Sequence, residues 1–137
     1  MTQINAYIRF NGNCREAMTF YKECLGGELT MQTVEGTPIE EHMPRSARKN
    51  ILHSTLVKDN LVLLGSDMTG PEGLQRGNGI SLCLDCSSEE EIHSYYEKLS
   101  EGGLATHPLE EAFWGGKFGD LVDKFGNSWL LNYSKPQ

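Results

Sequence analysis

The second half of this chain repeats the first. Residues 20–27 read FYKECLGG, and residues 95–103 read YYEKLSEGG, with one residue inserted. Both stretches close an amphipathic helical pattern, and paired glycines are typical of the carboxyl end of a helix. A second correspondence joins residues 56–60 with residues 121–125, each of which opens a hairpin turn. We therefore predict two similar structural modules.

Each module is predicted to run strand, helix, strand, strand, strand. In the first module the strands fall at residues 5–10, 29–34, 51–57 and 61–65, with a helix over 14–25 and a polar loop with one helical turn over 35–50. In the second they fall at residues 80–85, 104–107, 118–122 and 128–133, with a helix that begins after the serines at 87 and 88.

The predicted modules cover residues 1–68 and 79–135, and the Gly-rich residues 69–78 form the linker. The whole chain of 137 residues is then a single domain. Neither module is long enough to bury both faces of its own sheet. We therefore expect an α+β fold in which tandem βαβββ modules form one open, curved mixed sheet around a cavity.

Composition excludes several kinds of partner. The net charge of −7 disfavours a nucleic-acid surface, because phosphate binding depends on clustered Lys and Arg. No run of 18 apolar residues is present, so no membrane span is predicted. The N-terminus lacks the charged and apolar regions of a signal peptide, which favours a cytoplasmic protein.

The four cysteines predict neither zinc nor disulfide chemistry. Cys83 and Cys86 form a lone C-x-x-C, whereas a zinc site needs a second close pair of ligands. A redox dithiol is expected to open a helix with a lowered thiol pKa. We interpret all four as buried or strand-edge thiols.

Two sets of motifs resemble a known family. Residues 7–17 read YIRFNGNCREA, and the closing part of the chain carries Phe113-Trp114, Phe118-Gly119, the DKFG turn at 123–126, Trp129 and Asn132. Together they resemble the PhnB-like branch of the vicinal oxygen chelate superfamily, which includes glyoxalase I, bleomycin and fosfomycin resistance proteins, and extradiol dioxygenases. The resemblance implies a glyoxalase/bleomycin resistance-like fold and a homodimer. Members of the branch often carry a demethylubiquinone methyltransferase label, but no glycine-rich turn follows a strand here.

The same resemblance locates the metal ligands of the metal-using members. Those proteins place His or Glu on the first and last strands of each half, and the matching positions here fall near Ala6, Leu64, Gly79 and Leu130. None of these side chains ligates a metal, so we predict no metal and no cofactor. A divalent metal held by displaced ligands is the alternative, and it would make the protein a glyoxalase-type lyase or isomerase, or a resistance transferase.

The candidate catalytic residues are His53 and Glu110. His53 is the one histidine predicted inside a strand, where it is either a general base or ligand-orienting group, or a hydrogen-bonded sheet residue. Glu110 and Glu111 precede Phe113 and Trp114, and one of them serves as general acid or base if that loop covers the cavity mouth. A solvated pair is the other interpretation. The remaining histidines are predicted at the surface: His42, His93 and His107.

The candidate ligand-binding residues are Arg9, His53, Trp114 and Asn132. Trp114 has a glycine neighbour and is a good platform for a planar ligand, whereas Trp129, followed by Leu130 and Leu131, is interpreted as core. The sequence thus predicts a protein that binds a small organic molecule in a cavity without the superfamily metal. Whether any reaction follows is left open.

Overall fold

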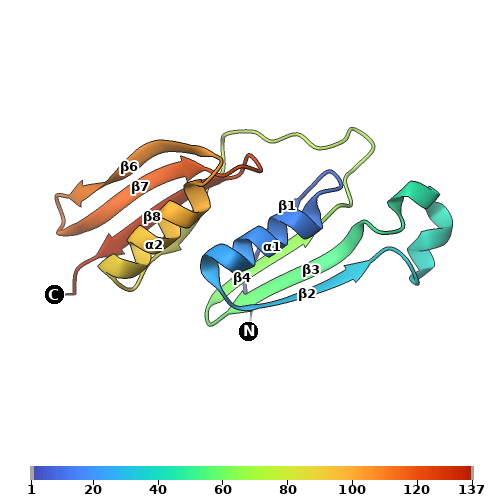
Figure 1. Ribbon diagram of the computed structural model, residues 1–137, viewed down its shortest axis with the longest axis horizontal. Coiled ribbons are helices and arrows are strands. Elements are labelled where there is room, and N and C mark those ends of the chain that lie inside the picture. The colour runs from blue at the N-terminus through green and yellow to red at the C-terminus, as the bar shows by residue number, and fades with distance from the viewer. Residues whose placement is uncertain (1, 137) are drawn as a thin grey trace. The chain divides into compact units, whose positions relative to one another are not determined.

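The structure, a computed structural model, describes residues 2–136. The chain divides after Gln75 into two compact units. Each unit contains one α-helix and one four-stranded mixed sheet (Figure 1). Within the described residues, neither α-helix is long enough to cross a membrane, since each has 12 residues.

The first unit contains the strands β1 to β4 and the helix α1. The bounds are β1 Ala6–Arg9, α1 Cys14–Leu25, β2 Glu28–Thr33, β3 Ile51–Lys58 and β4 Leu61–Ser66, with 3₁₀ turns at Pro38–His42 and Arg45–Ala47 between β2 and β3. The strand order is β1-β4-β3-β2. β1 pairs with β4 in parallel, and the other neighbours are antiparallel.

The apolar stripe of α1 covers one face of this sheet. Seven residues of the helix are buried, at the spacing expected for an amphipathic helix: Cys14, Ala17, Met18, Phe20, Tyr21, Cys24 and Leu25. Below them lie the buried Leu56 of β3 and Leu63 of β4. Close approach of helix and sheet depends on Gly65, because a Cβ there would lie 2.8 Å from Met18 Sδ.

The start of α1 is held by a residue distant in the sequence. Asn13 precedes the first turn of the helix, but its side chain makes no capping hydrogen bond. Instead Asp67, which follows β4, accepts hydrogen bonds through Oδ1 from the backbone N–H groups of Gly12 and Cys14, both at 2.9 Å. Its Oδ2 accepts from the Ile51 N–H at 2.8 Å. One buried carboxylate therefore joins α1, β3 and β4.

The second unit repeats this plan. The bounds are β5 Leu82–Asp85, α2 Glu89–Ser100, β6 Leu104–Ala112, β7 Gly116–Val122 and β8 Ser128–Ser134. The order β5-β8-β7-β6 matches that of the first unit, and β5 pairs with β8 in parallel. Ser88 caps α2 by accepting the Glu91 N–H at 3.1 Å, as its sequence predicts.

β6 is longer than predicted. The predicted strand ended at His107, but β6 continues through Pro108 to Ala112, so Glu110 and Glu111 lie in a strand and not in a loop. β6 is an edge strand, where a missing N–H can point away from the sheet. The register with β7 shifts on both sides of His107, which accommodates the proline.

The repeat and the α+β class are confirmed. Arg9 pairs with Ser66 in the first sheet, and Asp85 pairs with Asn132 at the corresponding place in the second. Residues 69–78, predicted as the linker, lie between β4 and β5. The strands of the described residues pair as two four-stranded sheets. The union of the sheets around one cavity stays a prediction, as do the module bounds 1–68 and 79–135.

Candidate functional site

Each sheet has one face covered by its helix and one open face. On β3, Ser54 and Leu56 are buried on the side of α1, whereas the alternate residues His53 and Val57 are exposed. On β8, Trp129 and Leu131 are buried on the side of α2, whereas Leu130 is 37% exposed. We call the uncovered sides the first open face, in the unit of α1, and the second open face, in the unit of α2.

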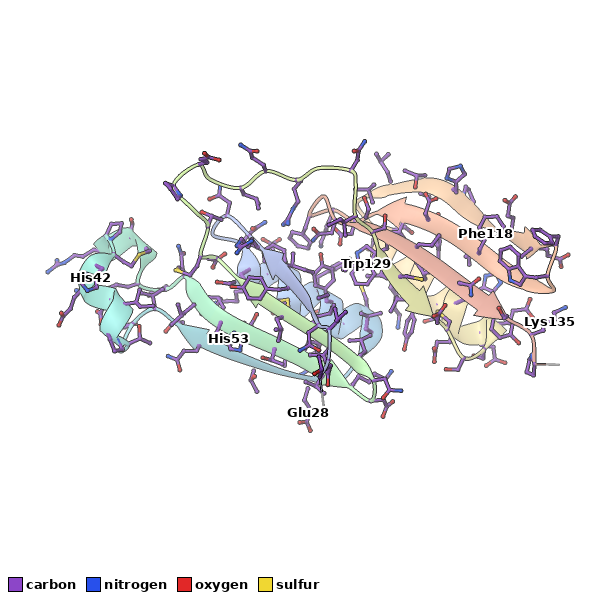
Figure 2. The ribbon with its side chains drawn as sticks, turned by 180° about the vertical axis from the view of Figure 1, so that it is seen from behind. Glu28, His42, His53, Phe118, Trp129 and Lys135 are labelled. Atoms are coloured by element: carbon purple, nitrogen blue, oxygen red, sulfur yellow. The ribbon has the colours of Figure 1, made fainter. Side chains whose placement is uncertain are left out.

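Arg9 and His53 both lie on the first open face. Figure 2 labels His53 on β3. The Arg9 guanidinium carbon lies 5.4 Å from the centre of the Tyr7 ring, which is itself 47% exposed. His53 Nε2 lies 3.2 Å from Thr55 Oγ1 on the same strand. Because β4 separates β1 from β3, the two backbones are about 10 Å apart. Arg9 and His53 therefore share a face, with one strand between them.

Trp114 and Asn132 belong to the second unit. Trp114 lies in the β6–β7 turn, and its ring centroid is 5.6 Å from that of Phe118 at an interplanar angle of 34°. Phe118 pairs with Asn132, whose Nδ2 donates to Asp85 Oδ1 at 3.3 Å. Glu110 pairs with Phe118 from the other side. The second open face thus carries one row of four side chains across its strands, in the order Asp85, Asn132, Phe118 and Glu110.

Two exposed aromatic residues lie next to each other at the β6–β7 turn. Phe113 is 98% exposed and Trp114 is 47% exposed, and their ring centroids lie 5.1 Å apart in an edge-to-face arrangement. Trp129, in contrast, is 1% exposed, and its Nε1 donates to Asp123 Oδ2 at 2.8 Å. The prediction that Trp129 belongs to the core is confirmed, so Trp114 is the tryptophan available for stacking.

The repeat relates the candidate residues of the two units. The shared registers make Arg9 the counterpart of Asp85, and Ser66 the counterpart of Asn132. His53 precedes Ser54, which pairs with Gly65, just as Phe118 precedes Gly119, which pairs with Leu131. The equivalent positions therefore differ in chemistry. A cation in the first unit corresponds to a carboxylate in the second, a hydroxyl to an amide, and an imidazole to a phenyl ring.

A histidine–aspartate pair was missed by the sequence reasoning. His107, interpreted as a surface residue, is indeed exposed, but its Nδ1 lies 2.9 Å from Asp120 Oδ2 and 3.1 Å from Oδ1. The Thr106 hydroxyl also donates to Asp120. The Thr106 hydrogen bond first, and His107 second, lower the pKa of Asp120. His107 and Asp120 are 13 residues apart, so only the β6–β7 register brings them together.

The residues of this chain do not fit the metal site of the superfamily. Leu64 and Leu130 belong to the open faces, Ala6 pairs with the buried Leu63 on the covered side, and Gly79 precedes β5. Among residues 2–136, no three His, Cys, Asp or Glu side chains lie close enough together to hold a metal ion. We derive no metal-dependent step.

The C-x-x-C thiols do not form a reactive pair. Cys83 is exposed on β5 and Cys86 is buried just after it. Burial raises the pKa of Cys86 to about 12, and burial together with Asp85 raises the pKa of Cys83. Both shifts disfavour the thiolate that redox and metal chemistry require.

A hollow also runs along α2. Its lining residues all fall between Ser88 and Glu101, and four of them are glutamates. A single helix forms this surface, without the aromatic lining of a typical ligand site. We therefore place the candidate site on the open faces and not on α2.

Comparison with known proteins identifies the family. The model of the 3-demethylubiquinone-9 3-methyltransferase family, to which PhnB-like proteins belong, matches residues 2–132. The chain belongs to this family. This PhnB-like chain is 29% identical to protein YjdN of Escherichia coli, across 98% of its own length and 97% of that protein.

Solved structures support the same assignment. Protein PA1353 from Pseudomonas aeruginosa is 35% identical, with a TM-score of 0.85 over 99% of this chain and all of that one. A PhnB protein from Bacillus cereus is 24% identical, with a TM-score of 0.72 over 97% of this chain and all of that one. A glyoxalase/bleomycin resistance protein/dioxygenase from Alicyclobacillus acidocaldarius, 16% identical over 98% of this chain and 92% of its own, has a TM-score of 0.60. The PhnB-like assignment and the glyoxalase/bleomycin resistance-like fold are confirmed.

Proposed function

We propose that this PhnB-like protein binds a small planar organic molecule on its second open face, against Trp114 and Phe118. The observation that carries the proposal is the half-exposed Trp114 ring beside Phe118 on an otherwise solvated face. A tryptophan left in water gains by stacking on an aromatic ligand, which adds about 0.5–1.5 kcal/mol to the burial of apolar area. Trp114 therefore serves as the platform.

Polar groups beside the platform would orient the ligand. Asn132 and Asp85 hydrogen-bond to each other on β8 and β5, next to Phe118. Small-molecule sites commonly combine an apolar floor with a few placed polar groups, which give orientation more than affinity. Within this proposal Asn132 contacts the polar edge of the ligand.

Arg9 and His53 form the second part of the proposal. They lie on the first open face, at positions equivalent to Asp85 and Phe118. We assign them to ligand contacts of the first unit. Catalytic roles for His53 and Glu110 stay predictions, as do the homodimer and the cytoplasmic location. Sedimentation equilibrium of untagged protein tests the dimer.

The descriptive name of the family refers to a methyltransferase, but we do not propose methyl transfer for this chain. Both sheets are mixed, with one parallel and two antiparallel strand pairings in each unit. The doubly wound parallel sheet with a glycine-rich turn, which usually carries a nucleotide-type cofactor, is a different arrangement. Ligand binding without that cofactor is the function that these residues support best.

The first experiment has two parts. Elemental analysis of protein purified without tag or chelator, followed by thermal shifts with divalent ions, tests the metal-free site. One metal per chain with an ion-dependent rise in Tm would overturn it. Equilibrium dialysis with 2-methoxynaphthalene then tests aromatic binding. We expect saturable binding to the wild-type protein.

A pair of matched variants locates that binding. Trp114→Ala removes the platform, and we expect affinity for 2-methoxynaphthalene to fall about five- to tenfold. Leu104→Ala removes a 65% exposed apolar side chain at the opposite end of β6 and should leave the affinity unchanged. Equal affinities of the wild-type protein and the Trp114→Ala variant would contradict the proposed site.

A further inference from the structure

His107 and Asp120 form an ordered pair at the edge of the second open face. Asp120 is directly paired with His107 on β6 and with Leu130 on β8. The side chains are 71% and 39% exposed, so both are accessible to a ligand. The hydroxyl oxygen of Tyr96 on α2 lies 2.9 Å from the backbone carbonyl oxygens of both His107 and Asp120. Its single proton is shared between them, which ties α2 to the two strands beneath the pair.

The hydrogen bonds to Asp120 determine the tautomer of the neutral His107 ring. An ionised carboxylate only accepts hydrogen bonds, so Nδ1 of a neutral His107 carries the proton that it donates to Asp120. Its Nε2 is then an acceptor, on the opposite side of the ring from Asp120. The lowered pKa of Asp120 keeps this carboxylate ionised at neutral pH. With a neutral His107 ring, the pair therefore presents a hydrogen-bond acceptor to solvent whose orientation Asp120 holds.

This acceptor lies within reach of the aromatic platform. Phe118 and Asp120 are two residues apart on β7, with Gly119 between them on the covered side, so both side chains occupy the second open face. His107 is paired with Asp120 on the adjacent strand. Two residues of a strand span about 7 Å and neighbouring strands lie about 5 Å apart, so the His107 backbone is about 8–9 Å from that of Phe118. That distance suits a two-ring ligand with one ring stacked on Trp114 and Phe118 and a polar group on the second ring near His107.

The charges on the second open face determine which polar group of a ligand can bind there. Asp85, Glu110 and Asp120 all belong to it, and the whole chain carries a net charge of −7. A ligand carboxylate would be repelled by these groups, whereas a neutral hydrogen-bond donor complements them. A hydroxyl on the ring is the simplest group that does so.

We propose that the second open face takes a planar aromatic compound bearing a neutral hydroxyl group, which donates its hydrogen bond to His107 Nε2. The assignment rests on the proposed function, since Trp114 and Phe118 supply the stacking. His107 is the specificity-determining residue, and Asp120 is the positioning residue that holds its ring.

Two probes that differ in one group test the inference. 2-Naphthol carries the hydroxyl, and 2-methoxynaphthalene carries an ether in its place and cannot donate. In equilibrium dialysis at neutral pH, we expect the wild-type protein to bind 2-naphthol about three- to tenfold more tightly, the contribution of one hydrogen bond. Equal affinities, or tighter binding of the ether, would overturn the inference.

Variants assign the difference to the histidine. In His107→Ala we expect the two affinities to become equal through loss of 2-naphthol affinity alone, and unchanged binding of the ether shows that the variant is folded. His93→Ala removes an exposed histidine of α2 that contacts Lys117, and should preserve the preference. A preference that survives in His107→Ala would also overturn the inference. If the wild-type protein binds neither probe, the proposed function itself fails.

Discussion

Replacement of Asp67 by alanine should severely destabilise the first unit. Asp67 is 7% exposed and accepts three backbone hydrogen bonds, from Gly12, Cys14 and Ile51. Gly12 is exposed, so water can replace the carboxylate there. Cys14 and Ile51 are 0% and 1% exposed, and their N–H groups would lose their partner in a dry environment.

The magnitude follows from those two buried donors. Each buried donor without a partner costs about 1–3 kcal/mol, so Asp67→Ala should lower the free energy of unfolding by about 2–4 kcal/mol after partial relaxation. At about 4 °C per kcal/mol, Tm should fall by about 8–16 °C. A domain of ordinary stability has about 5–15 kcal/mol in total, so the loss is a large fraction.

Urea unfolding followed by far-UV circular dichroism measures the effect. Asp67→Asn keeps one acceptor oxygen and should lose about half as much free energy, while Glu72→Ala, at an exposed position of the same unit, should change it by less than about 0.5 kcal/mol. Both tryptophans lie in the second unit, so their fluorescence reports whether that unit unfolds together with the first. A loss below about 1 kcal/mol in Asp67→Ala would refute the reasoning.

Three further outcomes are expected. Gly116→Ala should lower the free energy of urea unfolding by about 1–3 kcal/mol, because the new Cβ would collide with the Tyr133 carbonyl oxygen. In the control variant Gly70→Ala the new Cβ meets no neighbour, so equal stability of the two variants would contradict this reasoning. In the native protein, Cys83 should react first with a disulfide reagent and the other three thiols only on unfolding; rapid reaction of more than one thiol disagrees with the burial. Because the pKa of Asp120 is lowered, its ionised form stabilises the fold above the unfolded-state pKa of about 3.9, and this small contribution is lost as pH falls through the folded pKa. Tm of the wild-type protein should therefore approach that of Asp120→Asn between about pH 4 and pH 2, and a constant gap would argue against it.

The local patterns of the chain predicted its helices well. The bounds of α1, Cys14–Leu25, follow from a periodic apolar stripe that ends at two glycines, so no distant contact is needed to find them. β6 shows the opposite case. The predicted strand stopped before Pro108, yet β6 continues through it because β6 lies at the edge of its sheet, where proline is tolerated. Which strand lies at the edge depends on the order of all four strands, and no local sequence pattern contains that order.

The exposure of the two tryptophans could be predicted from their neighbours in the sequence. Trp114 beside a glycine is exposed, and Trp129 between a serine and a leucine on a regular strand is buried. The His107–Asp120 pair and the Asp67 clamp could not be predicted in this way. Each joins residues at least 13 positions apart through the register of strands or the end of a helix, and a single sequence gives no signal for such pairings.

The parallel pairing inside each unit also constrains the order in which the chain folds. β3 and β4 are separated by two residues, so this hairpin can form as soon as both strands exist. β1 can pair with β4 only after a loop of more than 50 residues has closed. The conformational entropy of that loop is lost before the contacts between the two strands can stabilise the pair. We infer that β1, with four residues, docks last and opens first. Native-state hydrogen exchange should therefore find the amide of Ile8 less protected than that of Leu56, and the reverse order would show that the unit opens elsewhere.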